Sequence, residues 1–153
     1  RFGNVIGTRG SVLPKFIYQL KNNQKITLTS ENTTRFFVST KDSVDCIINS
    51  IFMMKGGEIF IPKIINSIKI HDLAIALKEY YASSRSKLIK IGLRSGEKND
   101  EKILTKSEYF FLKYYRNLFI IDKLDRHKIM KVKKKIHYFD SSQAKLMKKK
   151  RNN

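Results

Sequence analysis

The first sixteen residues constrain the fold of this chain more than any other stretch. An apolar run over residues 1–6 ends in a loop at 7–11 that contains two glycines and Arg9, and an apolar helical pattern begins at Val12. This order predicts a strand, a tight loop and a helix. Backbone amides at a helix start, with an arginine in the loop before it, suit a phosphate ester. An ordinary corner between a strand and a helix explains the same pattern.

Hydrophobic periodicity in the rest of the chain predicts further helices and strands. Apolar residues recur at helical spacing in three segments, 12–20, 44–52 and 71–81. Strand-like composition is found in five segments, 26–29, 35–38, 58–62, 88–93 and 108–122. Ser39 is a suitable N-cap for the second helix, and the first two of these strands are expected to form a hairpin around the polar turn 30–33. The chain is therefore expected to have an α/β fold.

The net charge of +19 is unevenly distributed. Residues 123–153 contain twelve Lys and Arg residues against Asp125 and Asp140, a net charge of +10, whereas residues 1–122 have a net charge of +9. The tail has too few apolar residues for a core, so we expect it to be disordered.

One hypothesis that follows from this charge is a small basic nucleic-acid-binding protein. Its lysine runs at 131–135 and 145–151 would bind phosphates, and Tyr138 and Phe139 would stack on bases. No nucleic-acid-binding motif is found in residues 1–122, which makes nucleic acid the less favoured partner.

The single cysteine, Cys46, excludes a disulfide within the chain. It lies within a predicted helix, so we expect it to be buried as a small apolar residue. A reducing compartment follows, and we expect a cytoplasmic location. No apolar run approaches the ~18 residues typical of a membrane span.

Candidates for acid–base chemistry are few. His71, His127 and His137 are widely separated, and none has a cysteine or carboxylate at metal-ligand spacing, so no metal site is expected. His71 lies beside Asp72 at a predicted helix start, where a capping or surface role is the simpler explanation.

Two patterns imitate catalytic motifs. Gly3, Gly7 and Gly10 resemble a dinucleotide fingerprint but lack the βαβ unit that such a fingerprint requires. Tyr109 and Lys113 have the spacing of a Tyr-x-x-x-Lys pair, but in a β-prone run they would lie ~13 Å apart. We assign neither motif, and no catalytic residue is predicted in this chain.

Four sequence blocks carry a resemblance to a known family, RFGNVIGTRGSVLP at 1–14, TRFF at 34–37, GGEIFIPK at 56–63 and LRSGEK at 93–98. In this order they resemble the nucleotide-sugar 4,6-dehydratases and epimerases of polysaccharide biosynthesis, which are extended short-chain dehydrogenase/reductases. The resemblance covers residues 1 to about 122. The segment 54–63 is closer to the dehydratase branch than to the C4-epimerase branch.

The resemblance implies a domain organisation. Residues 1–6 would be the last portion of a Rossmann domain whose larger part precedes residue 1. Residues 1–122 would form the nucleotide-sugar-binding part, and 123–153 the lysine-rich tail. The preceding half would bind NADP or NAD and carry the catalytic residues, so residues 1–153 alone are expected to be inactive. The full-length enzyme would act on a UDP-sugar as a homo-oligomer, most closely resembling UDP-N-acetylglucosamine 4,6-dehydratases.

The resemblance also implies substrate-binding residues. The positions that match Asn4, Arg35 and Arg94 bind the diphosphate of a UDP-sugar, and guanidinium groups suit phosphate oxygens because they donate forked hydrogen bonds. The position that matches Glu97 binds the two ribose hydroxyls. The positions along the path of the nucleotide and over the uracil match four apolar residues, Val12, Leu13, Ile26 and Leu28.

Arg9 and Ser11 are further candidates for substrate binding in the opening loop. At three positions the residue in this chain differs from the one that is usual in the family. Ser95 replaces a proline, which is expected to loosen the turn that aims Glu97. Asn99 and Asp100 replace a leucine and a histidine, which weakens the prediction of a helix after this turn.

Overall fold

The computed structural model describes residues 1–63, 66–81, 85–127, 129, 132 and 140–142. Four helices are found among them, α1 (Val12–Lys21), α2 (Thr40–Met53), α3 (Ile70–Tyr80) and α4 (Lys106–Tyr109). The strands are β1 (Asn4–Val5), β2 (Ile26–Leu28), β3 (Thr34–Val38), β4 (Ile59–Pro62), β5 (Asn66–Lys69), β6 (Leu88–Lys90), β7 (Leu112–Tyr115) and β8 (Leu118–Ile121). The described chain is therefore a mixed α/β structure with small sheets.

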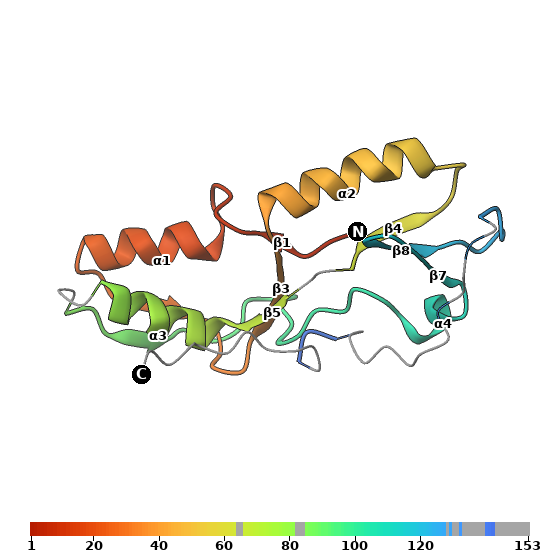
Figure 1. The fold of residues 1–153 in the computed structure, drawn as a ribbon. Coiled ribbons are helices and arrows are strands. Elements are labelled where there is room, and N and C mark those ends of the chain that lie inside the picture. Colours follow the sequence, from red (N-terminus) through yellow and green to blue (C-terminus); the bar gives the residue numbers. More distant parts are fainter. Residues whose placement is uncertain (64–65, 82–84, 128, 130–131, 133–139, 143–153) are drawn as a thin grey trace, which may run out of the picture.

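The strands form three separate sheets. At the centre, β3 pairs with β1 in parallel and with β5 in antiparallel orientation. On one side β2 and β6 pair in parallel beneath α1 and α3, and on the other side β8 lies between β4 and β7 in an antiparallel sheet. Figure 1 shows the result, an elongated arrangement in which the central strands connect two lobes.

Each lobe has its own apolar core. Residues of α1, α3, β2 and β3 form the first core, which includes the fully buried Phe16 and Ile26. Residues of β3, β4, β7 and β8 with the segment 103–104 form the second, and Cys46 of α2 packs beside it against Phe60. Because Phe36 and Phe37 alternate along β3, they point into different cores, so β3 joins the two lobes.

Helix α2 starts as the sequence predicts but is only partly covered. The side chain of Ser39 accepts a hydrogen bond from the backbone N–H of Asp42, which caps the helix. Cys46 is buried, as expected. The predicted apolar face is exposed instead of buried, and its large side chains are Val44, Ile47, Ile48, Ile51 and Phe52. None of the helices in the described ranges is long and apolar enough to cross a membrane.

The predicted helices at 12–20, 44–52 and 71–81 are confirmed. The predicted hairpin is wrong, because β2 pairs with β6 while β3 pairs with β1 and β5. The β-prone run 108–122 does form β7 and β8, but it begins with the last residues of α4, where Thr105 and Glu108 form a capping box. Residues 97–104 contain no helix, as the substitutions at Asn99 and Asp100 led us to expect.

The expected disordered tail requires a correction for the part that the structure describes. Asp140 forms an isolated antiparallel bridge with Lys102, and Ser141 is completely buried. Hydrogen bonds, and not apolar packing, hold these residues against the rest of the chain. Composition alone therefore did not predict that they would be ordered. The lysine runs at 131–135 and 145–151 lie outside the described residues except for Val132.

Candidate functional site

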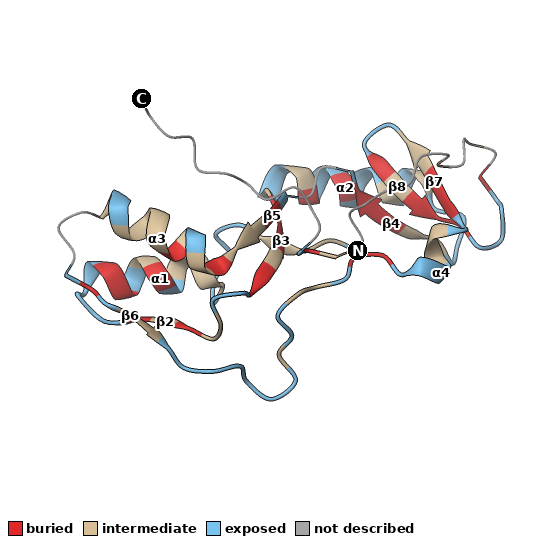
Figure 2. Cartoon of the chain, turned by 90° about the horizontal axis from the view of Figure 1, so that it is seen from below, coloured by how far each residue is buried: buried red, intermediate tan, exposed pale blue. Residues whose placement is uncertain are grey.

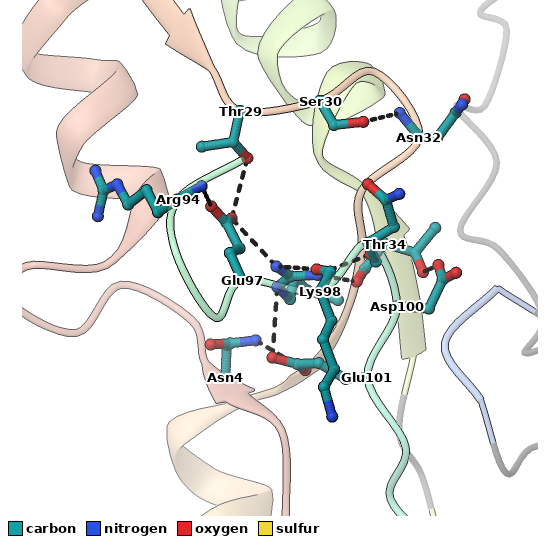
Figure 3. A network of polar contacts seen from close by, with 12 residues as sticks. Asn4, Thr29, Ser30, Asn32, Thr34, Arg94, Glu97, Lys98, Asp100 and Glu101 are labelled. Atoms are coloured by element: carbon teal, nitrogen blue, oxygen red, sulfur yellow. Dashed lines mark hydrogen bonds and ion pairs between the residues drawn. The ribbon is translucent and has the colours of Figure 1, made fainter. Parts of the chain in front are cut away.

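A pocket of about 300 Å³ lies where six segments meet. These are β1, the start of α1, the end of β2, β3, the start of α3 and the loop at 94–97. Seven of the predicted binding residues line it, Asn4, Ser11, Val12, Leu28, Arg35, Arg94 and Glu97. Figure 3 shows Asn4 and the loop that carries Arg94 and Glu97 in one region, although these two segments are far apart in the sequence. The fold thus gathers residues that are up to 93 positions apart in the sequence.

Arg35 is held mainly by backbone oxygens. Its Nη1 donates to the carbonyl oxygens of Thr34 at 2.8 Å and Asn99 at 2.9 Å, and its Nη2 donates to that of Lys98 at 2.8 Å. Lys98 and Asn99 are exposed, as is most of the segment that follows β6 up to them (Figure 2). Arg35 therefore fixes the loop at 98–99 against β3 at the edge of the pocket.

Two carboxylates balance the charge of Arg35. Its Nη2 lies 3.3 Å from Oε1 of Glu97, and its Nε lies 3.4 Å from Oε1 of Glu101. Asn4 reaches the same group, with Nδ2 donating to the carbonyl oxygen of Phe36 at 3.2 Å and to Glu101 at 3.5 Å. A phosphate can bind Arg35 by replacing one of these contacts, and those with the carboxylates are the longest.

Glu97 is positioned by a turn and by β2. The backbone N–H of Glu97 donates to the carbonyl oxygen of Arg94, and Gly96 between them has a φ of +77°, which favours glycine. The turn thus forms although Ser95 replaces the family's proline. Oε1 of Glu97 accepts from the hydroxyl of Thr29 at 3.0 Å, and Oε2 accepts from the backbone N–H of Arg94 at 3.2 Å. The Arg94 side chain extends away from this carboxylate (Figure 3).

Two hydroxyls at the pocket have no protein partner. Oγ of Ser11 and Oγ1 of Thr33 are buried and make no hydrogen bond within the described structure. Ser11 is the N-cap of α1, but its side chain makes no capping bond. Buried polar atoms without partners are uncommon, so they mark a place where a polar ligand group fits. Thr33 was not predicted, because a threonine in a polar turn gives no distinguishing signal in the sequence.

Three predicted residues do not line this pocket. Ile26 is completely buried in the core beneath α1 and does not line the pocket. It lies two positions before Leu28 on the same side of β2, and both side chains are buried. Leu13 is half-buried on α1 outside the pocket lining, and Arg9 is exposed in the loop before it.

A second, larger cavity of about 710 Å³ lies next to the first. Asn4, Arg35 and Glu97 line both cavities, so these three side chains form a shared wall. Lys98 and Lys102 line only the second cavity. Sequence reasoning did not identify this cavity.

Neither of the two described histidines, His71 and His127, lines the pocket. His71 is half-exposed with Nδ1 3.4 Å from Asp72, which agrees with a surface role. Nε2 of His127 lies 2.8 Å from Oε1 of Glu58, and both side chains are buried, a hydrogen bond that sequence spacing did not predict. His137 lies outside the described residues. Within the part that the structure describes, no group of three His, Cys, Asp or Glu residues could hold a metal ion.

The two imitations of catalytic motifs have structural explanations. Tyr109 ends α4 and Lys113 lies in β7, so they share neither the expected strand nor a helix. Nζ of Lys113 is buried and lies 2.9 Å from Oδ2 of Asp122. Gly3 lies against the backbone of Phe36, where a Cβ atom would clash.

Comparison with known proteins places this chain in a family. Residues 1–123 match the family described as polysaccharide biosynthesis protein. The chain is 42% identical over 120 residues to UDP-N-acetylglucosamine 4,6-dehydratase (inverting) of Campylobacter jejuni, covering 75% of this chain and 34% of that protein. It is 40% identical over 108 residues to UDP-glucose 4-epimerase of Rickettsia akari, covering 71% of this chain and 31% of the relative.

The structure agrees with this assignment. The X-ray structure of Pen from Bacillus thuringiensis superimposes with a TM-score of 0.80 at 34% identity, covering 95% of this chain and 44% of the other. This chain belongs to the polysaccharide biosynthesis protein family, whose named members here are nucleotide-sugar dehydratases and epimerases. It spans about a third of the length of the curated relatives that it matches.

Proposed function

We propose that this chain supplies the UDP-sugar-binding part of a nucleotide-sugar-modifying enzyme, most closely UDP-N-acetylglucosamine 4,6-dehydratase. The observation that carries this proposal is the single pocket lined by seven of the ten predicted binding residues. Its lining combines cationic side chains, a carboxylate and apolar groups, which match the phosphates, ribose and base of a nucleotide. The two unpartnered hydroxyls in the same pocket add polar groups that a ligand can satisfy.

Each lining residue would bind one part of the nucleotide. Arg35 and Arg94, with the amides at the start of α1, would bind the diphosphate. Glu97 would accept hydrogen bonds from the ribose hydroxyls, and Val12 and Leu28 would cover the uracil. NADP or NAD, held mainly by polypeptide preceding residue 1, would supply hydride transfer at the sugar. This chain would hold the nucleotide so that the sugar meets that cofactor.

A C4-epimerase of the same family is the alternative. The named dehydratase and epimerase relatives have nearly equal identity to this chain. The segment 54–63 favours the dehydratase. The reaction depends on acid and base groups that this chain would not supply, so residues 1–153 with UDP-N-acetylglucosamine and NADP are expected to show no turnover. Turnover by this chain alone would contradict the domain organisation that we propose.

The proposed substrate agrees with a cytoplasmic location, where a free buried cysteine such as Cys46 is ordinary. We further propose that the full-length enzyme is a homo-oligomer. A nucleic-acid-binding function of the lysine runs remains the candidate from a different class, and its support is charge alone.

A binding experiment separates the two classes. The 153-residue chain is titrated with UDP, with ADP and with a DNA oligonucleotide at 50 and 200 mM salt. The pocket predicts that UDP binds more tightly than ADP at both salt concentrations, because Val12 and Leu28 limit the size of the base. Replacing the three lysines at 148–150 by glutamine serves as the control and should leave UDP binding unchanged. Equal affinity for UDP and ADP, with tight DNA binding that weakens more than a hundredfold at 200 mM salt, would favour the nucleic-acid function.

A further inference from the structure

Residues 140–142, called the strap here, form hydrogen bonds with Thr34 of β3, Ser67 of β5 and Glu101. Ser141 is completely buried, and its backbone N–H donates to the carbonyl oxygen of Glu101 at 2.9 Å. The hydroxyl of Ser67, also completely buried, donates to the carbonyl oxygen of Ser141. The strap lies beyond residues 1–123, over which the chain matches its family. It is therefore a feature that neither the family match nor the sequence patterns assign to the site.

The side chain of Ser141 belongs to a continuous series of hydrogen bonds. The backbone N–H of Glu101 donates to Oγ of Ser141 at 2.8 Å, Oγ of Ser141 lies 2.6 Å from Oγ1 of Thr34, and Oγ1 of Thr34 donates to Oδ1 of Asp100 at 2.6 Å. An ionised carboxylate only accepts, so the hydroxyl hydrogen of Thr34 points to Asp100 and that of Ser141 points to Thr34. Both hydroxyls in this series then donate and accept.

Two residues of this series, Thr34 and Glu101, also contact Arg35. Its guanidinium donates to the carbonyl oxygens of Thr34 and Asn99 and lies 3.4 Å from the carboxylate of Glu101. Ser141 thus bonds to two residues that contact Arg35. These are Thr34 on β3 and Glu101 in the loop after β6. With these groups in place, the guanidinium is pre-organised and loses little freedom when a phosphate binds.

Glu97 has two supports besides its contact with Arg35, the hydroxyl of Thr29 and the backbone N–H of Arg94. We infer that Ser141 is a positioning residue for Arg35, acting through Thr34 and the loop, and that it strengthens binding of a diphosphate without touching it. This inference rests on the proposed function, because Arg35 is assigned there to the diphosphate. The inference predicts that loss of the Ser141 hydroxyl lowers the affinity that the phosphates add to UDP binding and leaves the affinity for the nucleoside unchanged.

The experiment compares UDP with uridine. Dissociation constants of both ligands, and the melting temperature, are measured for the 153-residue chain, for Ser141→Ala and for Ser142→Ala. The control is matched, because Ser142 is the neighbouring residue and, among the residues that the structure describes, its exposed hydroxyl bonds to Asp140 and not to Thr34 or Glu101. For Ser141→Ala, the Kd for UDP is expected to rise about tenfold, as for the loss of one hydrogen bond between the Arg35 guanidinium and the diphosphate. The Kd for uridine should stay within about twofold of the unsubstituted value, and Ser142→Ala should change neither.

A second pair of variants tests the same series of hydrogen bonds at Thr34. Thr34→Val keeps the shape of the side chain and removes the hydroxyl, whereas Thr34→Ser keeps the hydroxyl. The valine variant should reproduce the loss of UDP affinity, and the serine variant should retain it. Hydrogen exchange of the unsubstituted chain adds a readout without any variant. Because coupling is reciprocal, UDP should slow exchange of the Glu101 amide, which donates to Ser141.

The outcomes are distinct. If the unsubstituted chain binds UDP no better than uridine, the proposed function is wrong at this site. If it prefers UDP but Ser141→Ala and Thr34→Val keep the same ratio of the two constants, then Ser141 is only structural and the inference is overturned. A lower melting temperature with an unchanged ratio would overturn it equally. If Ser141→Ala does not fold, the threonine pair and the Glu101 exchange decide.

Discussion

Nη2 of Arg35 lies 3.3 Å from Oε1 of Glu97, and both side chains are mostly buried at the wall between two cavities. The residue proposed for the diphosphate is therefore paired with the residue proposed for the ribose. A bound diphosphate would take over the donor that now faces Glu97, while the three backbone contacts of Arg35 stay in place. The two residues are coupled, and their variants should have opposite effects on the preference for UDP over uridine.

Arg35→Lys should weaken UDP binding by about tenfold or more and uridine binding much less. A lysine cannot reproduce the forked donors of the guanidinium, and it also releases the loop at 98–99. Isothermal titration calorimetry with both ligands measures the two constants. Arg9→Lys is the control, because Arg9 is exposed and does not line the pocket. Equal losses for UDP and uridine would exclude a specific role of Arg35 at the phosphates.

Glu97→Gln should weaken uridine binding by about tenfold and UDP binding less than that. The amide accepts less well from the ribose hydroxyls, but removing the negative charge frees Arg35 for the diphosphate. The same titrations measure both constants, with 2′-deoxyuridine as a third ligand that should show a smaller loss. Stronger loss for UDP than for uridine would contradict the coupling between Glu97 and Arg35.

Asp122→Asn should lower the free energy of unfolding by about 2 kcal/mol, because it removes the buried carboxylate beside the charge of Lys113 and leaves the exposed Asp125, 2.5 Å away, as its partner. The two side chains are 1% and 2% exposed, so solvent does not screen them. Urea denaturation measures the change. Asp45→Asn, in an exposed pair with Lys41, should leave the denaturation midpoint unchanged. If the two variants lost equal stability, the Lys113–Asp122 pair would not be a buried support of the β7–β8 sheet.

Stability should fall in acid partly because of Glu108. Hydrogen bonds from Arg1 hold the pKa of Glu108 at about 2, below its ordinary value of 4.5. A carboxyl whose pKa is lower in the folded state stabilises the fold above its unfolded pKa, and this stabilisation is lost as the pH falls from 4.5 towards 2. Glu108→Gln keeps a side chain that suits the capping box. Between pH 6 and pH 3 its denaturation midpoint should therefore change less than that of the unsubstituted chain, and an equal change would contradict the assignment.

The apolar face of α2 should cause the 153-residue chain to self-associate. Ile51 is 57% exposed and Phe52 is 85% exposed, and further apolar side chains lie beside them. A contiguous apolar surface of this kind favours contact with a second copy when nothing else covers it. Replacing Ile51 and Phe52 by lysine should lower the average mass in analytical ultracentrifugation, while Leu124→Lys, at an exposed leucine off this helix, should not. A monodisperse, cooperatively melting monomer would show that this face does not associate.

The sequence alone determined the features that depend on neighbouring residues. Helical spacing placed α1, α2 and α3, and Ser39 marked the start of α2, because periodicity and capping act within a few residues. The four ordered blocks also predicted the family to which the chain belongs.

Only the tertiary structure decided which distant segments meet. Local composition placed β2 and β3 on either side of a polar turn, yet β2 pairs with β6 and β3 lies between β1 and β5. The same alternation made Ile26 and Leu28 equivalent, and both side chains are buried, but only Leu28 lines the pocket. Burial of Ser141 rests on hydrogen bonds to residues 40 and 107 positions away. Such long-range pairings depend on how whole elements pack, and no local pattern specifies them.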